Sequence, residues 1–415
     1  MIVLAIYSGK GDRMKRAILV VVDSLGIGQM DDVVECRPQD VGADTFRHIL
    51  DTIREIEIPN FEKLGINKLL HHKRLQNIDN MGSYGILNLE HQGADSYLGH
   101  QEIMGSKPKE PLLVPFSFYK DMVVEKLINE GHKVTCLEKD RPYILVDDFV
   151  IVADNIETDY GQIYNVTGPL DDISFDKIIE IGEKVRSVVK VNRVIALGGE
   201  GVSLSRILES IEERDDGLVG VNSPKSGVYN QGYLSRHLGY GVNPQTQVST
   251  LLAKSNYEVI LIGKMQDVIE CEHATKIPKV DTEQVMTSII EVMQQATTGM
   301  IAATVQETDL AGHAQDPQKY AEKLMIVDKY LGDIIEGMND EDMLLVTADH
   351  GNDPTIGFRQ HTREKTFLLV YGRKLRPVDL GERSTLSDIA ATIADYFGVG
   401  NTENGSSFLN IIMVS

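Results

Sequence analysis

Short apolar runs alternate with amphipathic helical patterns along much of this chain, and this alternation constrains its fold more than any other feature. Near the start, the run AILVVV at residues 17–22 has the continuous apolar character of a strand covered on both faces. Strand–helix alternation is typical of a parallel sheet with helices packed on both sides. We therefore expect an α/β protein with a doubly wound, mostly parallel sheet. Its later strands are predicted at Val259–Ile262, Met300–Val305, Leu344–Val346 and Phe367–Tyr371.

Two long helices are predicted between these strands, at Thr282–Met293 and Tyr320–Met338. In the second, apolar residues recur every three or four positions, which is the spacing of one buried face. Near the C-terminus, Thr385-Leu-Ser-Asp388 resembles a capping box, and it predicts a helix that runs to Phe397.

The middle of the chain departs from this pattern. Prolines and the glycine-rich segment Gly198-Gly-Glu-Gly201 interrupt it, and a long Gly-, Ser-, Asn- and Tyr-rich stretch follows. We interpret this change as a second, smaller α/β domain inserted into the first. The predicted division is a disordered leader at 1–13, a core at 14–111 and 241–415, and an inserted cap at 112–240.

Composition narrows the choice of partners. A formal charge of −21 argues against a nucleic-acid groove or an anionic membrane surface. It leaves room for a phosphorylated substrate, because acidic residues packed around divalent metals can make a locally positive site. The three cysteines form no C-x-x-C pair, which fits a reducing cytoplasm and disfavours a cysteine metal site. We expect a cytoplasmic protein that acts on a small phosphorylated metabolite, without a nucleic-acid or membrane partner.

Carboxylates and imidazoles recur where the predicted strands end. In open α/β sheets, ligands bind beyond the carboxyl ends of the strands. A single aspartate there is usually a turn or helix cap, and a single histidine is usually structural. Taken together, however, the set predicts a metal centre, and its mixed oxygen and nitrogen donors suit Mn²⁺, Zn²⁺ or iron. The candidates are Asp23, then Asp309 and His313 in ETDLAGH, then Asp349 and His350 in VTADHGND, and finally His361.

A second candidate stretch is GADSYLGHQEIMG, at residues 93–105, in which Ser96 lies in a glycine-flanked turn. Taken alone, Ser96 would be interpreted as a helix N-cap. Beside a metal centre, its hydroxyl could bind a metal, lose its proton and attack phosphorus.

The strings VVVDSLGIG, GADSYLGHQEIMG, ETDLAGH and VTADHGNDP, the last followed by HTRE, resemble the phosphopentomutase family of the alkaline phosphatase superfamily in sequence and in order. The resemblance implies a metal-binding α/β core with an inserted cap, and a mutase that moves a phosphoryl group within a sugar phosphate. It also implies two divalent ions, with Mn²⁺ expected and Zn²⁺ as the alternative, and a sugar bisphosphate as a candidate primer.

The same resemblance assigns roles to individual residues. One ion would be held by Asp23, Asp349 and His350, with Ser96 at the phosphorylated position, and the other by Asp309, His313 and His361. The substrate-binding residues would be Asp154, Lys264, Arg236 and His237.

Three departures from the family bear on the substrate. Ser96 stands where phosphopentomutases have threonine, and the four-residue spacing from Asp309 to His313 is also closer to cofactor-independent phosphoglycerate mutases. Ala196-Leu-Gly-Gly199 replaces a substrate-binding arginine, and glycine cannot replace an arginine fork on a phosphate. The sequence therefore leaves the substrate open. A phosphatase or phosphodiesterase is the alternative function, and a metal-binding regulatory protein without activity is the third.

Overall fold

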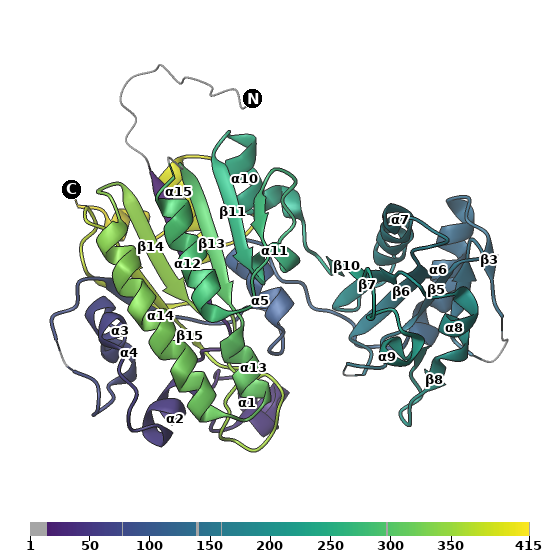
Figure 1. The fold of residues 1–415 in the computed structure, drawn as a ribbon, viewed down its shortest axis with the longest axis horizontal. Helices are drawn as coiled ribbons and strands as arrows, with labels where there is room; N and C mark the ends of the chain where they lie inside the picture. The colour runs from purple at the N-terminus through teal and green to yellow at the C-terminus, as the bar shows by residue number, and fades with distance from the viewer. Residues whose placement is uncertain (1–14, 77, 138–140, 159, 296–297, 415) are drawn as a thin grey trace. The chain divides into compact units, whose positions relative to one another are not determined.

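The computed structural model describes residues 15–76, 78–137, 141–158, 160–295 and 298–414. Two compact units make up the chain (Figure 1). The core unit comprises the residues up to Pro108 together with those from Asn243 onward, and the inserted unit comprises Lys109–Val242. The leader expected at residues 1–13 lies outside the described residues.

An eight-stranded sheet organises the core unit. Its strands are β1 (Arg16–Val22), β2 (Ser83–Leu87), β11 (Glu258–Gly263), β12 (Thr275–Ile277), β13 (Gly299–Val305), β14 (Asp342–Thr347), β15 (Thr366–Tyr371) and β16 (Asp379–Arg383). They lie in the order β12-β11-β13-β1-β14-β15-β2-β16. The strands from β12 to β14 are parallel, which confirms the predicted sheet. In contrast, β15 is antiparallel to both neighbours, because the loop after β14 folds back at the same edge of the sheet instead of crossing over.

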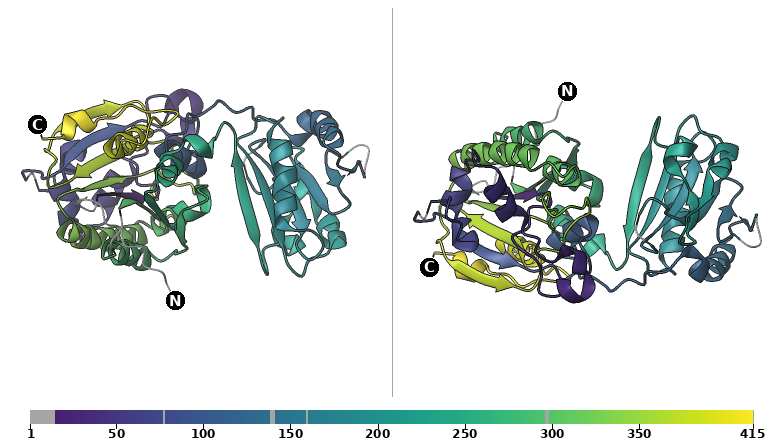
Figure 2. Two further views of the ribbon diagram at one scale, coloured as in Figure 1. Left: turned by 90° about the horizontal axis from the view of Figure 1, so that it is seen from above. Right: turned by 90° about the horizontal axis from the view of Figure 1, so that it is seen from below.

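Helices cover both faces of this sheet (Figure 2). The even-numbered residues of β1, from Ile18 to Val22, pack against one layer of helices, and the odd-numbered ones, from Ala17 to Val21, pack against the other. The first layer contains α2 (Thr45–Thr52), α3 (Pro59–Leu64), α12 (Thr282–Met293) and α14 (Pro317–Gly337). The second contains α5 (Ser96–Ile103), α10 (Val248–Lys254), α11 (Met265–Val268), α15 (Asp388–Phe397) and α16 (Leu409–Ile412). The remaining core helices are α1 (Val33–Cys36), α4 (Asn67–Leu70) and α13 (Glu307–His313).

All five predicted strands of the core are present, and the helix predicted at Thr282–Met293 coincides with α12. The second predicted helix is α14, which starts at Pro317 because Asp316 caps it by accepting a hydrogen bond from the Lys319 amide. The predicted capping box is wrong. The helix begins at Asp388, and Thr385 instead donates its hydroxyl to the buried Glu102.

The inserted unit has its own hydrophobic core around a six-stranded sheet of order β10-β7-β6-β5-β4-β3. Only the β6–β7 pair is parallel. The strands are β3 (Val134–Thr135), β4 (Ile144–Val146), β5 (Val150–Asp154), β6 (Ile163–Pro169), β7 (Arg193–Gly199) and β10 (Leu234–Gly239), with β8 (Ile211–Glu213) and β9 (Val219–Val221) as a separate pair. The helices are α6 (Phe116–Asn129), α7 (Phe175–Arg186), α8 (Leu204–Glu209) and α9 (Ser223–Ser226).

Candidate active site and metal centre

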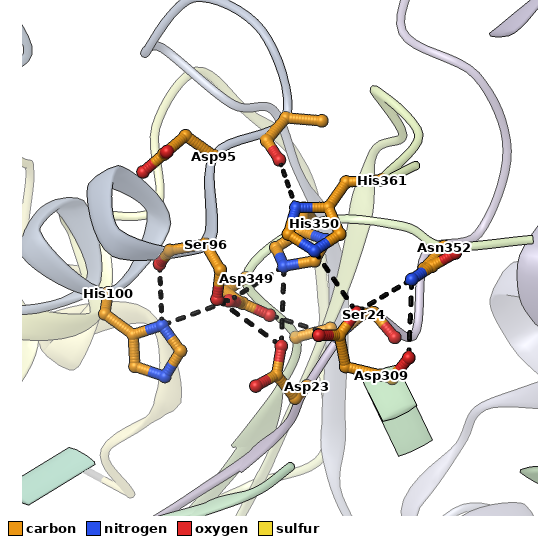
Figure 3. A network of polar contacts seen from close by, with 12 residues as sticks. Asp23, Ser24, Asp95, Ser96, His100, Asp309, Asp349, His350, Asn352 and His361 are labelled. Carbon is orange, nitrogen blue, oxygen red and sulfur yellow. Dashed lines mark hydrogen bonds and ion pairs between the residues drawn. The ribbon is translucent and has the colours of Figure 1, made fainter. Parts of the chain in front are cut away.

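Three neighbouring parallel strands, β13, β1 and β14, end at one edge of the core sheet. Asp23 directly follows β1, Asp349 lies two residues after β14, and Asp309 lies in α13, which begins two residues after β13. The three carboxylates therefore gather from segments that are far apart in sequence (Figure 3). All three side chains are buried.

Asp309 and His313 lie on one face of α13, since residues four apart in a helix are neighbours. The His313 Nε2 atom is 3.3 Å from the Asp309 Oδ2 atom. On the other side, the Asn352 side-chain amide donates to Asp309 Oδ1 at 2.9 Å. A Cβ atom on Gly312 would lie 2.5 Å from the Asn352 side chain, so the glycine of ETDLAGH permits this close packing.

The loop between His350 and His361 is closed by an antiparallel bridge between Gly351 and Thr362. The two backbone hydrogen bonds of that bridge measure 3.0 and 2.8 Å. As a result, the rings of His350 and His361 stack with their centroids 4.1 Å apart. The His361 Nε2 atom comes within 3.4 Å of Asp309 Oδ1. The bridge thus returns a histidine to the candidate metal-binding group across eleven residues of chain.

His313, His350 and His361 are held by the same kind of contact. This shared contact shows whether the site fits a metal. In each, Nδ1 contacts a backbone carbonyl, and because a carbonyl only accepts, Nδ1 carries the proton. When the ring is neutral, it turns the lone pair of Nε2 toward the carboxylates, as metal-binding histidines do. Nε2 of His350 is buried and has no hydrogen-bond partner. The contacts are His313 to Arg359 O (2.5 Å), His350 to Gly351 O (2.8 Å) and His361 to Ala94 O (2.8 Å).

The charges of the site shift one another's pKa. Burial alone would lower the pKa of His350, but the carboxylates of Asp349 and Asp23 raise it well above its usual value. Burial alone would raise the pKa of Asp309, but His313 and His361, when both nitrogens of each ring are protonated, hold it well below its usual value. The carboxylates of Asp23, Asp309 and Asp349 are buried close together and repel one another. Positive charge beside them is therefore required. Divalent cations fit this donor set. Three groups of side chains lie close enough together to hold one, namely Asp309, His313 and His361, then Asp23, Asp309 and His350, and then Asp23, His100 and Asp349. His350 Nε2 is also 3.3 Å from Asp349 Oδ2, and the predicted set of Asp23, Asp349 and His350 around a single ion stays a prediction.

Ser96 is the first residue of α5 and is 6% exposed. The N-cap is Asp95, which accepts a hydrogen bond from the Leu98 amide at 2.9 Å, so the interpretation of Ser96 as the cap is wrong. The Ser96 Oγ atom instead donates to Asp349 Oδ2 at 2.6 Å. A Cβ atom on Gly99 would lie 2.6 Å from the Asp349 carbonyl oxygen, so the glycine lets α5 approach the end of β14.

Lys264 directly follows β11, and its side chain reaches Asp23 and Ser96. Its Nζ atom is 2.6 Å from Asp23 Oδ2 and 2.7 Å from Ser96 Oγ. Burial alone would lower the pKa of Lys264, but the neighbouring aspartates, led by Asp23, raise it above its usual value. The lysine therefore stays cationic and donates to the serine hydroxyl oxygen.

Asp154, Arg236 and His237 belong to the inserted unit, and they do not gather there. Asp154 ends β5, is fully buried, and accepts hydrogen bonds from the Phe116 and Val219 amides at 2.7 and 3.1 Å. Burial raises its pKa to about 6. Arg236 and His237 are consecutive residues of β10, so their side chains point to opposite faces of the sheet. One ligand on one face would meet only one of them.

Sequence reasoning missed three residues of the site: Ser24, His100 and Asn352. His100 lies one helical turn after Ser96, and that spacing was a usable signal. Ser24 carries no such signal. It adopts a left-handed backbone conformation (φ 68°), and its amide donates to Asp349 Oδ1 at 3.1 Å. Strain of this kind, in a residue other than glycine, persists where surrounding contacts enforce it.

The sequence matches the metalloenzyme superfamily over residues 15–401. The chain belongs to this superfamily. Similar solved structures include phosphoglycerate mutase from Leishmania mexicana, at 13% identity over 99% of this chain and 100% of that one, with a TM-score of 0.47. Alkaline phosphatase from the Antarctic bacterium TAB5 matches at 12% identity over 94% and 100% of the two chains, with a TM-score of 0.37.

Membership of the metalloenzyme superfamily confirms the coarser part of the resemblance, namely a metalloenzyme, and Asp and His side chains make up its candidate metal-binding groups. Assignment to the phosphopentomutases and the identity of the metal stay predictions. Among the residues described, no helix combines the length and the apolar character needed to cross a bilayer.

Proposed function

We propose that this protein is a metal-dependent phosphosugar mutase of the phosphopentomutase type, and that Ser96 carries the phosphoryl group. The observation that supports this most is the position of Ser96 Oγ, 2.6 Å from Asp349 Oδ2 and 2.7 Å from Lys264 Nζ. A serine hydroxyl needs such neighbours to become a nucleophile at neutral pH.

The hydroxyl proton of Ser96 points to Asp349, because Lys264 can only donate and therefore occupies a lone pair of Oγ. The cationic Lys264 also stabilises negative charge on Oγ as the proton leaves. Two divalent ions, when held by the two ligand sets, would add the positive charge that lowers the pKa of the hydroxyl and neutralises the phosphoryl oxygens.

Two half-reactions then move the phosphoryl group. In the first, phosphorylated Ser96 gives its phosphoryl group to a free hydroxyl of a sugar monophosphate. The bond from Oγ to phosphorus breaks, a bond from the sugar oxygen to phosphorus forms, and the sugar hydroxyl loses its proton. In the second, Oγ attacks the other phosphoryl group of the resulting bisphosphate, and the sugar oxygen that departs takes up a proton. A sugar bisphosphate would prime an unphosphorylated enzyme by the second half-reaction.

Substrate recognition is assigned to the inserted unit and to Lys264. The absence of an arginine at Ala196–Gly199 disfavours a second tightly gripped phosphate at that place in β7. We therefore keep the substrate class as a sugar phosphate and leave ribose 5-phosphate as one member of the panel to be tested.

The test follows phosphorus directly. The Mn²⁺-loaded protein is incubated with single sugar monophosphates and a trace of the matching bisphosphate, and ³¹P NMR records positional isomers and inorganic phosphate. A mutase should interconvert the isomers of at least one sugar with little inorganic phosphate. Release of inorganic phosphate in step with substrate loss would instead identify the protein as a phosphatase, with water as the acceptor.

A further inference from the structure

His100 is a fully buried histidine of α5 with a polar partner on each ring nitrogen. Figure 3 shows the contacts of its Nδ1 atom. Its Nδ1 atom is 2.8 Å from the Ser96 carbonyl oxygen and 3.0 Å from Asp349 Oδ2. Its Nε2 atom is 2.8 Å from the hydroxyl of Thr304, a buried residue of β13. The ring thus joins the helix that carries Ser96 to β13 and to the segment that follows β14.

The contacts decide which ring nitrogen carries the proton. A carbonyl oxygen and a carboxylate oxygen both accept hydrogen bonds, so Nδ1 must be the donor. The Thr304 hydroxyl can then donate to Nε2 of the neutral ring. His100 also lies within reach of Asp23 and Asp349, as a third ligand to a metal would. A nitrogen that carries a proton cannot bind a metal, however, and the close contact with the Ser96 carbonyl requires that proton.

Asp349 gains a fixed orientation from these contacts. Its Oδ1 atom accepts from the Ser24 amide at 3.1 Å, and its Oδ2 atom accepts from His100. The same Oδ2 atom accepts the Ser96 hydroxyl at 2.6 Å. Donors on both oxygens prevent the carboxylate from rotating away from Ser96. Small displacements of reacting groups matter, since an error of about 1 Å can lower a rate by about a hundredfold.

We propose that His100 is a positioning residue, which holds the Asp349 carboxylate against the Ser96 hydroxyl through an Nδ1–H donor. The rate effect of this role rests on the proposed phosphoryl transfer, whereas the tautomer of His100 does not depend on it.

Two substitutions of His100 test the contacts of its two ring nitrogens separately. The side-chain amide of asparagine lies near the place of Nδ1, and that of glutamine lies near the place of Nε2. His100→Asn should keep the donor to Asp349 and retain kcat within about fivefold. His100→Gln should lose that donor and lower kcat by about 10- to 100-fold, as loss of a partner that orients a ligand does. Metal content and KM should stay within about twofold in both variants.

His132→Gln is the matched control, because His132 is also a buried histidine but lies in the inserted unit, paired with Asp147. It should leave transfer unchanged. Equal losses in His100→Asn and His100→Gln would overturn the positioning role, because a merely structural ring would respond alike to both. Loss of a bound metal in His100→Gln would also overturn it, and would make His100 a ligand.

The tautomer is measured on the intact protein with ¹⁵N-labelled histidine by long-range ¹H–¹⁵N NMR, and the signal of His100 is assigned by its loss in His100→Asn. A proton on Nδ1 supports the inference, and a proton on Nε2 overturns it. If the wild type transfers no phosphoryl group to any sugar, the proposed function fails, and the tautomer measurement alone decides the role of His100.

Discussion

The carboxyl ends of parallel strands hold very different side chains in the two units. In the core unit, β13, β1 and β14 lead into Asp309, Asp23 and Asp349, whose carboxylates point toward one another. In the inserted unit, the parallel strands β6 and β7 end in Gly168-Pro169 and Gly198-Gly199. Within the described residues, every group of Asp and His side chains that could hold a metal lies in the core unit.

Buried aspartates show the same contrast. Asp349 and Asp309 receive their hydrogen bonds largely from side chains, namely histidine, serine and asparagine. Asp154 of the inserted unit receives them from backbone amides at the start of α6 and in β9. This contrast supports the proposal that catalysis belongs to the core unit and recognition to the inserted one.

The largest effect should come from removing the nucleophile in the core. Ser96→Ala should lower transfer by about 10⁴-fold or more, because loss of a nucleophile removes the covalent route. The six Asp and His ligands remain, so metal content should not change. Mass spectrometry after incubation with a sugar bisphosphate should show one added phosphate on the wild type and none on the variant.

Ser96→Thr should keep part of the activity, since threonine carries the same hydroxyl, although its extra methyl must fit at the start of α5. Ser117→Ala, at an exposed serine of the inserted unit, should behave as the wild type. Turnover of Ser96→Ala at the wild-type rate would remove Ser96 from the mechanism and favour hydrolysis by water.

The second-largest effect should be on metal content. It should fall when aspartates of the core unit are replaced and stay unchanged when an aspartate of the inserted unit is replaced. The wild type should hold about two divalent ions per chain, as two-metal phosphoryl-transfer sites do. Asp309→Ala and Asp349→Ala should each lose about one ion, because each removes a ligand of a different position. Asp154→Asn in the inserted unit should keep both. Inductively coupled plasma mass spectrometry measures the content, and full occupancy in both core variants would refute the ligand assignment.

Removing the inserted unit should change metal binding less than it changes the selectivity among sugar phosphates. A variant that joins Pro108 to Asn243 through a short Gly-Ser linker keeps every strand of the eight-stranded sheet, so it should fold and bind metal. It should discriminate less among sugar phosphates and release more inorganic phosphate, because water can then replace the sugar hydroxyl. Circular dichroism and ³¹P NMR measure the two outcomes. Failure to fold would show that the core depends on the inserted unit.

The core strands could be predicted because both faces of β1, β13 and β14 are buried, which makes their sequences continuously apolar. The strand-end rule then indicated where the Asp and His side chains of the candidate site gather. Neither pattern could predict the direction of β15, which depends on how the loop through His361 folds back. The inserted unit left weaker signals, because strands such as β3 and β8 span only two or three residues.

Residues that orient the ligands were harder to find than the ligands themselves. Ser24 and Asn352 act through a backbone amide and a side-chain amide, and their partners Asp349 and Asp309 come from distant segments. Asp154 accepts hydrogen bonds from two backbone amides, and the substrate contact that the resemblance implies for it stays a prediction. The types of residue in a site can be inferred from the sequence. The hydrogen bonds that orient their side chains depend on tertiary packing.

The smallest effect should be on the pH dependence of stability. Each unit contains one buried aspartate for this test, and the two aspartates are held in similar ways. Asp154 in the inserted unit and Asp328 in the core both accept backbone hydrogen bonds, the latter from the Asn60 and Phe61 amides at 2.9 and 2.8 Å. Burial raises the pKa of each to about 6 from an ordinary value of 3.8. A raised pKa means that the folded state keeps the proton that the unfolded state loses. The stabilisation is thus full below about pH 4 and is lost as the pH rises to about 6.

Each aspartate should therefore lower the free energy of unfolding by up to about 3 kcal/mol between pH 4 and 6, since a tenfold change in proton affinity corresponds to about 1.4 kcal/mol. Asp154→Asn should remove this fall from the inserted unit and leave the core profile intact, and Asp328→Asn should do the reverse. Hydrogen exchange followed by mass spectrometry reads the two units separately through their own peptides. If Asp154→Asn flattens the pH dependence of core peptides as strongly as that of its own unit, the two units unfold together. The separation of a catalytic core from an independent recognition unit would then fail at the level of stability.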